Sequence, residues 1–406
     1  MRGAERAGME SVSVYTCRHN RERGQVLGPT RTRCRSSAVL AILLTALSLG
    51  LAACSVPRVG SFVPTGSLIT GRSSHTATLM QDGRVLIAGG EQDTLKGNGN
   101  TTTYLASVEL YDPTSGKFSL VESMTTPRSG HSATLLSDGR VLIAGGYDGV
   151  GNAPLASAEL YDPTSGKFSL VGSMTTPRSS HSATLLSDGQ VLITGGAGPV
   201  SGSDPALASA ELYDPKTGTF SPTRSMSRPR LGNTATLLLD GRVLVAGGYV
   251  GTLYNPGFDS AELYDPKSGS FSPTGSMSES RALLTGTLLR DGRVLIADDT
   301  DGSADLYDPK TGTFSLTGLM TYPGIGGAAA LLSDGRVLIG GGSCTAEGCE
   351  YPQVFDPGSD SFRATGDDTK SPPNRHATLT LLKDGRVLFA GGGFGELDTA
   401  AELFVP

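Results

Sequence analysis

The stretch His131–Gly146 reads HSATLLSDGRVLIAGG and decides the fold. Two apolar runs flank Asp138-Gly139, a pattern that predicts a two-residue hairpin in which both turn positions take a positive φ. A third segment, Ser157–Tyr161, follows after a loop, and a turn-forming Asp-Pro-Thr-Ser-Gly sequence then leads into a fourth, Phe168–Met174. Four such segments predict one four-stranded antiparallel sheet.

This unit recurs seven times, at intervals of 43 to 56 residues. The phrase DGRVLIAGG, with variations, begins at Asp82, Asp138, Asp188, Asp240, Asp291, Asp334 and Asp384. Its second strand is almost continuously apolar, which is typical of a sheet covered on both faces. Because one such sheet cannot cover both of its own faces, the units must stack against one another as blades.

The order of the segments indicates how the array closes. The body begins with a fourth-strand phrase, Phe62–Leu68, and ends with a third-strand phrase, Glu402–Phe404. Together these ends complete one blade, which removes a vulnerable pair of exposed sheet edges. The prediction is an all-β, seven-bladed β-propeller of four-stranded antiparallel blades, with the last blade closed by the N-terminal strand.

Residues 61–406 resemble the kelch family, whose bacterial members are grouped with the central propeller domain of galactose oxidase. The resemblance rests on the period near 50 residues, on the Tyr-Asp-Pro of each third strand and on paired glycines. These pairs are Gly89-Gly90, Gly145-Gly146, Gly195-Gly196, Gly247-Gly248, Gly341-Gly342 and Gly391-Gly392. The sequence departs from the family in having Phe for the usual Trp, and Asp298-Asp299 for the fifth glycine pair.

The N-terminal segment has the pattern of an export signal. Arginines precede an apolar run over 37–53, and Leu51-Ala52-Ala53-Cys54 resembles a bacterial lipobox. We therefore expect a signal peptide over 1–53, lipidation of Cys54, a short linker over 54–60, and a lipoprotein anchored on the extracytoplasmic side of a bacterial cell envelope. The alternative is an ordinary cleaved signal peptide with a chance cysteine.

Charge and cysteine content limit the partners. The first 53 residues carry eight Arg and three Glu, whereas the remainder carries 25 basic and 36 acidic residues, a net charge of −11. An acidic body argues against nucleic acid as a partner.

Because thiols oxidise outside the cytoplasm, Cys344 and Cys349 are expected to form a loop disulfide. The expected partner is an envelope or extracellular protein or a glycan, bound by a monomer.

Strand alternation places the Asp-Gly and Asp-Pro turns on one face and loops of unequal length on the other, the usual location of binding residues. Tyrosines on that variable face are candidate ligand contacts, with packing against neighbouring blades as the alternative. These tyrosines are Tyr104, Tyr147, Tyr249, Tyr254 and Tyr351, with Tyr322 also on this face.

An arginine recurs in the connection between blades, near the start of each first strand. The six are Arg72, Arg128, Arg178, Arg230, Arg281 and Arg375, and Gly324 takes the place in the sixth blade. A ring of guanidinium groups would suit an anionic ligand, and in some kelch proteins the matching arginine contacts ligands. The alternative, favoured because the residue repeats while a site usually breaks symmetry, is a structural pairing within each blade.

No catalytic residue, metal site or cofactor is predicted. The body histidines follow the arginine at one repeat position, which favours a structural role. These histidines are His75, His131, His181 and His376. The acidic stretch Asp298–Asp301 lacks the distal Glu of a calcium loop and is interpreted as a tight acidic turn, and neither a nucleophile motif nor a phosphate loop is found.

Three functions remain open at this point. The first is a binding module that recognises a protein or a carbohydrate through its variable face. The second is a galactose-oxidase-like copper oxidase, for which Cys344 or Cys349 with Tyr351 is the only Cys–Tyr combination available. The third is a sugar isomerase or mutarotase, which would require acid–base groups in the channel.

Overall fold

The computed structural model describes residues 59–96, 99–150, 153–199, 206–251, 257–298, 302–320, 328–340, 344–345, 348–349, 352–366, 377–392 and 399–406. The chain divides into two units, Met1–Cys54 and Ser55–Pro406, and all described residues belong to the second. The predicted signal peptide and Cys54 therefore lie outside the described residues. No helix in the described part is long and apolar enough to cross a membrane.

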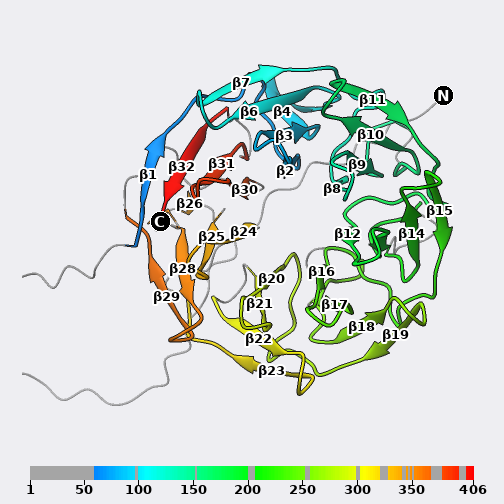
Figure 1. The fold of residues 1–406 in the computed structure, drawn as a ribbon, viewed down its shortest axis with the longest axis vertical. Coiled ribbons are helices and arrows are strands. Elements are labelled where there is room, and N and C mark those ends of the chain that lie inside the picture. The colour runs from blue at the N-terminus through cyan, green and yellow to red at the C-terminus, as the bar shows by residue number, and fades with distance from the viewer. Residues whose placement is uncertain are drawn as a thin grey trace, which may run out of the picture. The chain divides into compact units, whose positions relative to one another are not determined.

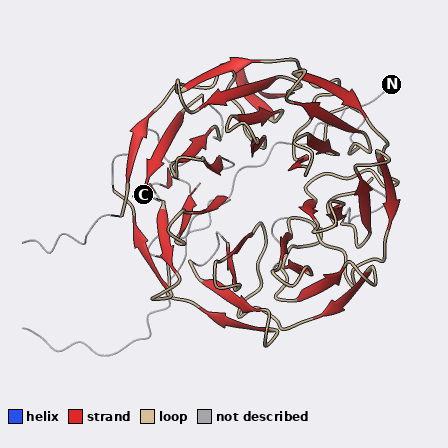
Figure 2. Ribbon diagram, viewed as in Figure 1, coloured by secondary structure: helices blue, strands red, loops and turns tan. Residues whose placement is uncertain are grey.

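Seven four-stranded antiparallel sheets form a ring, as predicted (Figures 1 and 2). Blade 1 consists of β2 (Thr76–Leu79), β3 (Val85–Ala88), β6 (Val108–Asp112) and β7 (Lys117–Leu120). Blade 2 consists of β8 (Ser132–Leu135), β9 (Val141–Ala144), β10 (Ala158–Asp162) and β11 (Lys167–Leu170). Blade 3 consists of β12 (Ser182–Leu185), β13 (Val191–Thr194), β14 (Ala210–Asp214) and β15 (Thr219–Pro222). Blade 4 consists of β16 (Thr234–Leu237), β17 (Val243–Ala246), β18 (Ala261–Asp265) and β19 (Ser270–Pro273).

The remaining blades follow the same plan. Blade 5 consists of β20 (Thr285–Leu288), β21 (Val294–Ala297), β22 (Ala304–Asp308) and β23 (Thr313–Leu316). Blade 6 consists of β24 (Ala328–Leu331), β25 (Val337–Gly340), β28 (Gln353–Asp356) and β29 (Ser361–Ala364). Blade 7 consists of β30 (Thr378–Leu381), β31 (Val387–Ala390), β32 (Ala401–Val405) and β1 (Ser61–Pro64). Two small hairpins are added, β4 (Glu91–Lys96) with β5 (Gly99–Tyr104), and β26 (Cys344–Thr345) with β27 (Gly348–Cys349).

The predicted closure is present in blade 7. Strand β1 pairs antiparallel with β32, with Phe62 opposite Phe404, so the first and last described strands share one sheet (Figure 1). The first strand of each blade contacts the first strands of both neighbouring blades, which forms an unbroken inner ring from β2 through β30 and back to β2. The ring therefore has no open blade edge at the chain ends.

The hairpin turns differ from the prediction. In blade 1 the Gly83 amide donates to Met80 O and the Met80 amide donates to Arg84 O, which leaves a three-residue loop. Only its glycine has a positive φ, at 93°. The expected two-residue turn was wrong, because a three-residue loop places the left-handed residue third and lets the Asp82 carboxylate accept the Arg84 amide.

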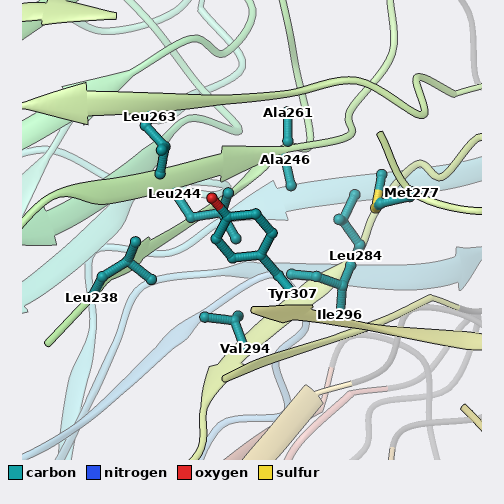
Figure 3. Packing of buried hydrophobic residues seen from close by; sticks show 10 residues of the cluster. All are labelled: Leu238, Leu244, Ala246, Ala261, Leu263, Met277, Leu284, Val294, Ile296 and Tyr307. Atoms are coloured by element: carbon teal, nitrogen blue, oxygen red, sulfur yellow. The ribbon is translucent and has the colours of Figure 1, made fainter. Parts of the chain in front are cut away.

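The hydrophobic core lies between adjacent blades. Figure 3 shows Tyr307 of blade 5 among side chains of blades 4 and 5, including Leu244 and Ile296. The Tyr307 ring also contacts Phe314 on the neighbouring strand, at a centroid distance of 4.8 Å. The same tilted Tyr–Phe contact occurs in blades 1 to 4, so the phenylalanine in place of tryptophan still packs in each blade.

Candidate functional site

The ring has two faces, which we name by their connections. The turn face carries the Asp-Gly hairpins between first and second strands and the Asp-Pro turns between third and fourth strands. The loop face carries the connections from second to third strand and from each blade to the next. The sequence-predicted tyrosines and arginines belong to connections on the loop face.

Five recurrent arginines are buried inside the blades rather than presented to solvent. Arg128 is fully buried: its Nη1 donates to the carbonyl oxygens of Gly145 and Ser157, and its Nη2 donates to Ser157 Oγ and to Glu159 Oε1 at 3.0 Å. Burial lowers the pKa of Arg128, and the bond to Glu159 opposes that shift. The other ion pairs are Arg72–Glu109, Arg178–Glu211, Arg230–Glu262 and Arg281–Asp305.

These pairs support the structural alternative for the arginines. The carboxylate also accepts backbone amides of the incoming connection, as Glu159 does from Thr125 at 2.8 Å, so each pair fixes the path between blades. The ligand-contact role proposed for Arg72, Arg128, Arg178, Arg230 and Arg281 fits poorly with side chains exposed by 2% or less. Arg375 lies outside the described residues.

Blade 5 varies the same arrangement. Asp298, at the place of the first glycine, uses its carboxylate to accept Arg281 Nη1 at 2.7 Å, where blades 1 to 4 use a backbone carbonyl. The carboxylate therefore replaces a lost backbone acceptor. The rest of the acidic stretch, 299–301, lies outside the described residues.

The histidines join neighbouring blades at the inner ring. His131 Nε2 lies 3.0 Å from Thr76 Oγ1, and His181 Nε2 lies 2.8 Å from Ser132 Oγ, in each case on the first strand of the preceding blade. Burial, with a smaller contribution from the neighbouring arginine, lowers the pKa of His131 and of His181 to about 3. His75 makes the corresponding contact with Thr378, and His376 lies outside the described residues.

A backbone belt follows the loop-face end of the inner ring through blades 1 to 4. The amide of Gly130 donates to Ser74 O, that of Ser180 to Gly130 O, and that of Gly232 to Ser180 O, which links blades 1 to 4. Ser74 and Ser180 have φ values of 53° and 50°, and Leu283 at the same repeat position in blade 5 has 53°. Residues other than glycine rarely adopt a positive φ, and such backbone strain often accompanies functional sites.

One group of side chains beside this belt breaks the repeat symmetry. Glu91 accepts Ser74 Oγ at 3.2 Å and Ser129 Oγ at 2.9 Å, and so joins blades 1 and 2. It stands where the next three blades have Tyr147, Ala197 and Tyr249, each of which makes the matching backbone bridge. The sequence interpretation did not single out Glu91, although this change after the glycine pair was visible in the sequence.

Two of the predicted tyrosines join Glu91 at this location. Tyr104 is opposite Glu91 in the β4–β5 hairpin, and its ring meets that of Tyr147 edge-on at 5.3 Å. Burial raises the pKa of Tyr104, and the nearby Glu91 carboxylate adds to the increase. We name Ser74, Glu91, Tyr104, Ser129 and Tyr147 the mouth cluster. It offers a carboxylate, hydroxyl groups and two partly exposed aromatic rings within one area.

The other predicted site residues do not join the mouth cluster. Tyr249 is only 7% exposed, and burial raises the pKa of its hydroxyl. It therefore fits the alternative given for these tyrosines, which is packing against neighbouring blades. Tyr254, Tyr322 and Tyr351 lie outside the described residues. The backbones of Cys344 and Cys349 are directly opposite in the β26–β27 ladder. The disulfide between them stays a prediction.

Comparison with known proteins gives the family context of this geometry. A model of the Kelch motif matches residues 127–175 and 230–278, in blades 2 and 4. The chain is a kelch-repeat β-propeller. Its fold is similar to that of a fungal alcohol oxidase of the AA5 family solved in complex with copper, at 20% identity and a TM-score of 0.67. That match covers 86% of this chain and 76% of the oxidase. No curated protein matches the sequence.

The described residues of this propeller do not fit a copper centre. Among them, His, Cys, Asp and Glu side chains do not gather in groups of three that could hold a metal ion. His75, His131 and His181 each bridge a different pair of blades, which keeps their rings apart. At 20% identity, the likeness to the oxidase concerns the fold alone.

Proposed function

We propose that this kelch propeller is an envelope-anchored binding module that recognises a protein or a carbohydrate through its loop face. The observation that carries the proposal is the mouth cluster, where one carboxylate and two aromatic rings depart from the repeated structure on the loop face. Structural positions repeat from blade to blade, whereas a binding site needs a local departure from the repeat.

The chemistry of the mouth cluster suits a hydroxyl-rich or amide-rich ligand. A tyrosine ring offers an apolar surface with a polar tip, and a carboxylate accepts hydrogen bonds from hydroxyl or amide groups. The rings of Tyr104 and Tyr147 are fixed by their edge contact, so little conformational entropy is lost on binding. The acidic body matches neither nucleic acid nor other polyanions.

The anchoring part of the proposal rests on the sequence of the first 54 residues. An export signal followed by a lipidated Cys54 would place the propeller outside the cytoplasmic membrane. Metabolic labelling with a radioactive fatty acid tests this part. Label that is lost in Cys54→Ser supports lipidation, and label retained in that variant contradicts it.

The binding part is tested by a glycan array together with a pull-down from envelope extracts. We expect a ligand retained by the wild-type chain to be lost from Glu91→Gln and from Tyr104→Ala. Asp138→Asn on the turn face is the matched control and should keep the ligand. Equal retention by all three variants would overturn the assignment to the loop face.

A second candidate, a carbohydrate-active enzyme, draws on the fold shared with the copper-bound oxidase. Assays for peroxide production with sugars after copper loading, and for sugar isomerisation without metal, separate it from a binding module. Turnover that depends on Glu91 would favour an enzyme at the mouth cluster.

A further inference from the structure

The turn face repeats an exposed ion pair with one exception. In six blades an arginine two residues after the turn aspartate pairs with that aspartate at N–O distances of 2.5–2.8 Å. The pairs are Asp82–Arg84, Asp138–Arg140, Asp240–Arg242, Asp291–Arg293, Asp334–Arg336 and Asp384–Arg386. In blade 3 the arginine is replaced by Gln190, so within the described ranges Asp188 accepts only the Gln190 amide, at 3.0 Å.

Two of these arginines also contact the Asp-Pro turn of the next blade through their guanidinium groups. Arg386 of blade 7 donates to Pro113 O of blade 1 at 3.1 Å, and Arg293 of blade 5 donates to Pro357 O of blade 6 at 3.0 Å. A guanidinium group therefore fits between the turn aspartate of one blade and the Asp-Pro turn of the next. At the boundary of blades 3 and 4, the corresponding residues are Asp188 and Pro266.

Asp188 and Pro266 line a cavity of about 600 Å³, together with Leu239, Arg242 and Lys267. We call this cavity the 188–266 groove. Its other carboxylates have partners, because Asp240 pairs with Arg242, and Asp265 accepts the Lys267 amide and Ser268 Oγ. Asp240 is thus the lining carboxylate with an ion pair, whereas Asp188 and Asp265 accept neutral donors, and Asp188 is the one of these two that stands at the Asp-Gly turn position where the other six blades have an arginine partner.

An apolar side chain borders the same groove. Leu239 is 74% exposed, and it stands at a repeat position that is polar in the other six blades. Those residues are Gln81, Ser137, Ser187, Arg290, Ser333 and Lys383. The blade that lacks the turn arginine is therefore next to the blade that has a leucine at the polar position. Both changes lie on the face opposite the mouth cluster. A single exposed leucine is ordinary on a protein surface, so the weight of Leu239 comes from its position in the lining of the groove that contains Asp188.

We infer that the 188–266 groove binds an arginine side chain of a partner peptide, with an adjacent aliphatic residue of that peptide against Leu239. The guanidinium group would donate to the Asp188 carboxylate and take the place that Arg293 and Arg386 fill in their own blades. Charge complementarity and a planar donor group favour arginine over lysine here. The inference does not rest on the proposed function, since it concerns the other face.

The test uses fluorescence anisotropy with the purified chain and two labelled peptides, Gly-Leu-Arg-Leu-Gly and the same peptide with citrulline for arginine. Citrulline keeps the shape but lacks the charge. We expect the arginine peptide to bind about fivefold more tightly, the size of a partly exposed ion pair. Asp188→Asn should remove this difference.

Gln190→Arg should weaken binding of the arginine peptide by a similar factor, because the new side chain would itself pair with Asp188. Asp138→Asn, the same turn position in blade 2, is the matched control and should bind as the wild type does. Equal binding of both peptides, absence of binding by the arginine peptide, or full binding by Gln190→Arg would each overturn the inference.

Discussion

Arg128 Nη2 donates to Glu159 Oε1 at 3.0 Å, and both side chains are completely buried. Charges without water are tolerated only when they are paired and hydrogen-bonded, and here the arginine also holds two backbone carbonyls. The pair connects the chain segment that enters blade 2 to the second and third strands of that blade. It therefore stabilises the junction between blades.

Removal of one partner from this pair should be costly. Arg128→Met leaves the Glu159 carboxylate buried without its cation, and we expect a loss of about 3–5 kcal/mol in the free energy of unfolding. Chemical denaturation measures this loss. The exposed pair Asp138–Arg140 is the control, and Arg140→Gln should cost less than about 1 kcal/mol. Similar losses in both variants would contradict the importance of burial.

The sequence contains a sign of this pairing. The sixth blade has Gly324 in place of the arginine, and the same blade has Gln353 in place of the glutamate. The two positions therefore change together within one chain, which is expected of residues in contact. The period, the strand order and the closure by Phe62 were predictable because they depend on local pattern alone. The inward direction of Arg128 depends on how the connection crosses the blade, which a repeat pattern does not show.

The mouth cluster was only partly predictable for a related reason. Tyr104 and Tyr147 were recognised as loop aromatics, but their contact requires the β4–β5 hairpin of blade 1 to lie beside the loop of blade 2. Tyr249, chosen by the same reasoning, is buried. Residue type and loop position select candidates, whereas accessibility depends on how neighbouring loops of unequal length pack together.

The buried histidines predict a dependence of stability on pH. The folded chain holds His131 and His181 with pKa values of about 3, while an unfolded histidine has a pKa near 6.5. The unfolded state therefore binds more protons below about pH 6.5, so stability is fully present above that pH and decreases as the pH falls toward 3. We expect each histidine to contribute a loss of about 2 kcal/mol between pH 7.5 and 5.

His131→Asn tests this histidine contribution, because Asn233 occupies the same repeat position in blade 4 and donates to Ser182 Oγ. Denaturant titrations of the wild type and the variant at both pH values should show a loss about 2 kcal/mol smaller in the variant. An identical loss in both proteins would indicate that His131 does not titrate with unfolding.

The closure of the ring predicts that the N-terminal strand stabilises the whole propeller. Phe62 is 6% exposed and packs on Phe404 and Phe389, with ring centroids 5.2 and 6.4 Å away. Phe62→Ala should cost about 3–5 kcal/mol, and deletion of residues 61–70 should lower the melting temperature further. Ile69→Ala, at a side chain that is 51% exposed, is the control. An unchanged melting temperature after the deletion would contradict closure by β1.

The glycine pairs predict a difference between two substitutions with the same backbone strain. Gly89 and Gly166 have φ values of 61° and 70°, so alanine at either position costs about 1–2 kcal/mol from conformation alone. A Cβ at Gly166 would meet nothing within 4 Å, whereas at Gly89 it would lie 2.5 Å from Arg128 O and 2.8 Å from His131 Cε1. Gly89→Ala must therefore displace the connection into blade 2, and we expect it to cost about 1–3 kcal/mol more than Gly166→Ala in thermal or denaturant unfolding. Equal losses in the free energy of unfolding would contradict this prediction, because they would show that the junction between blades rearranges around the new Cβ despite its buried Arg128–Glu159 pair.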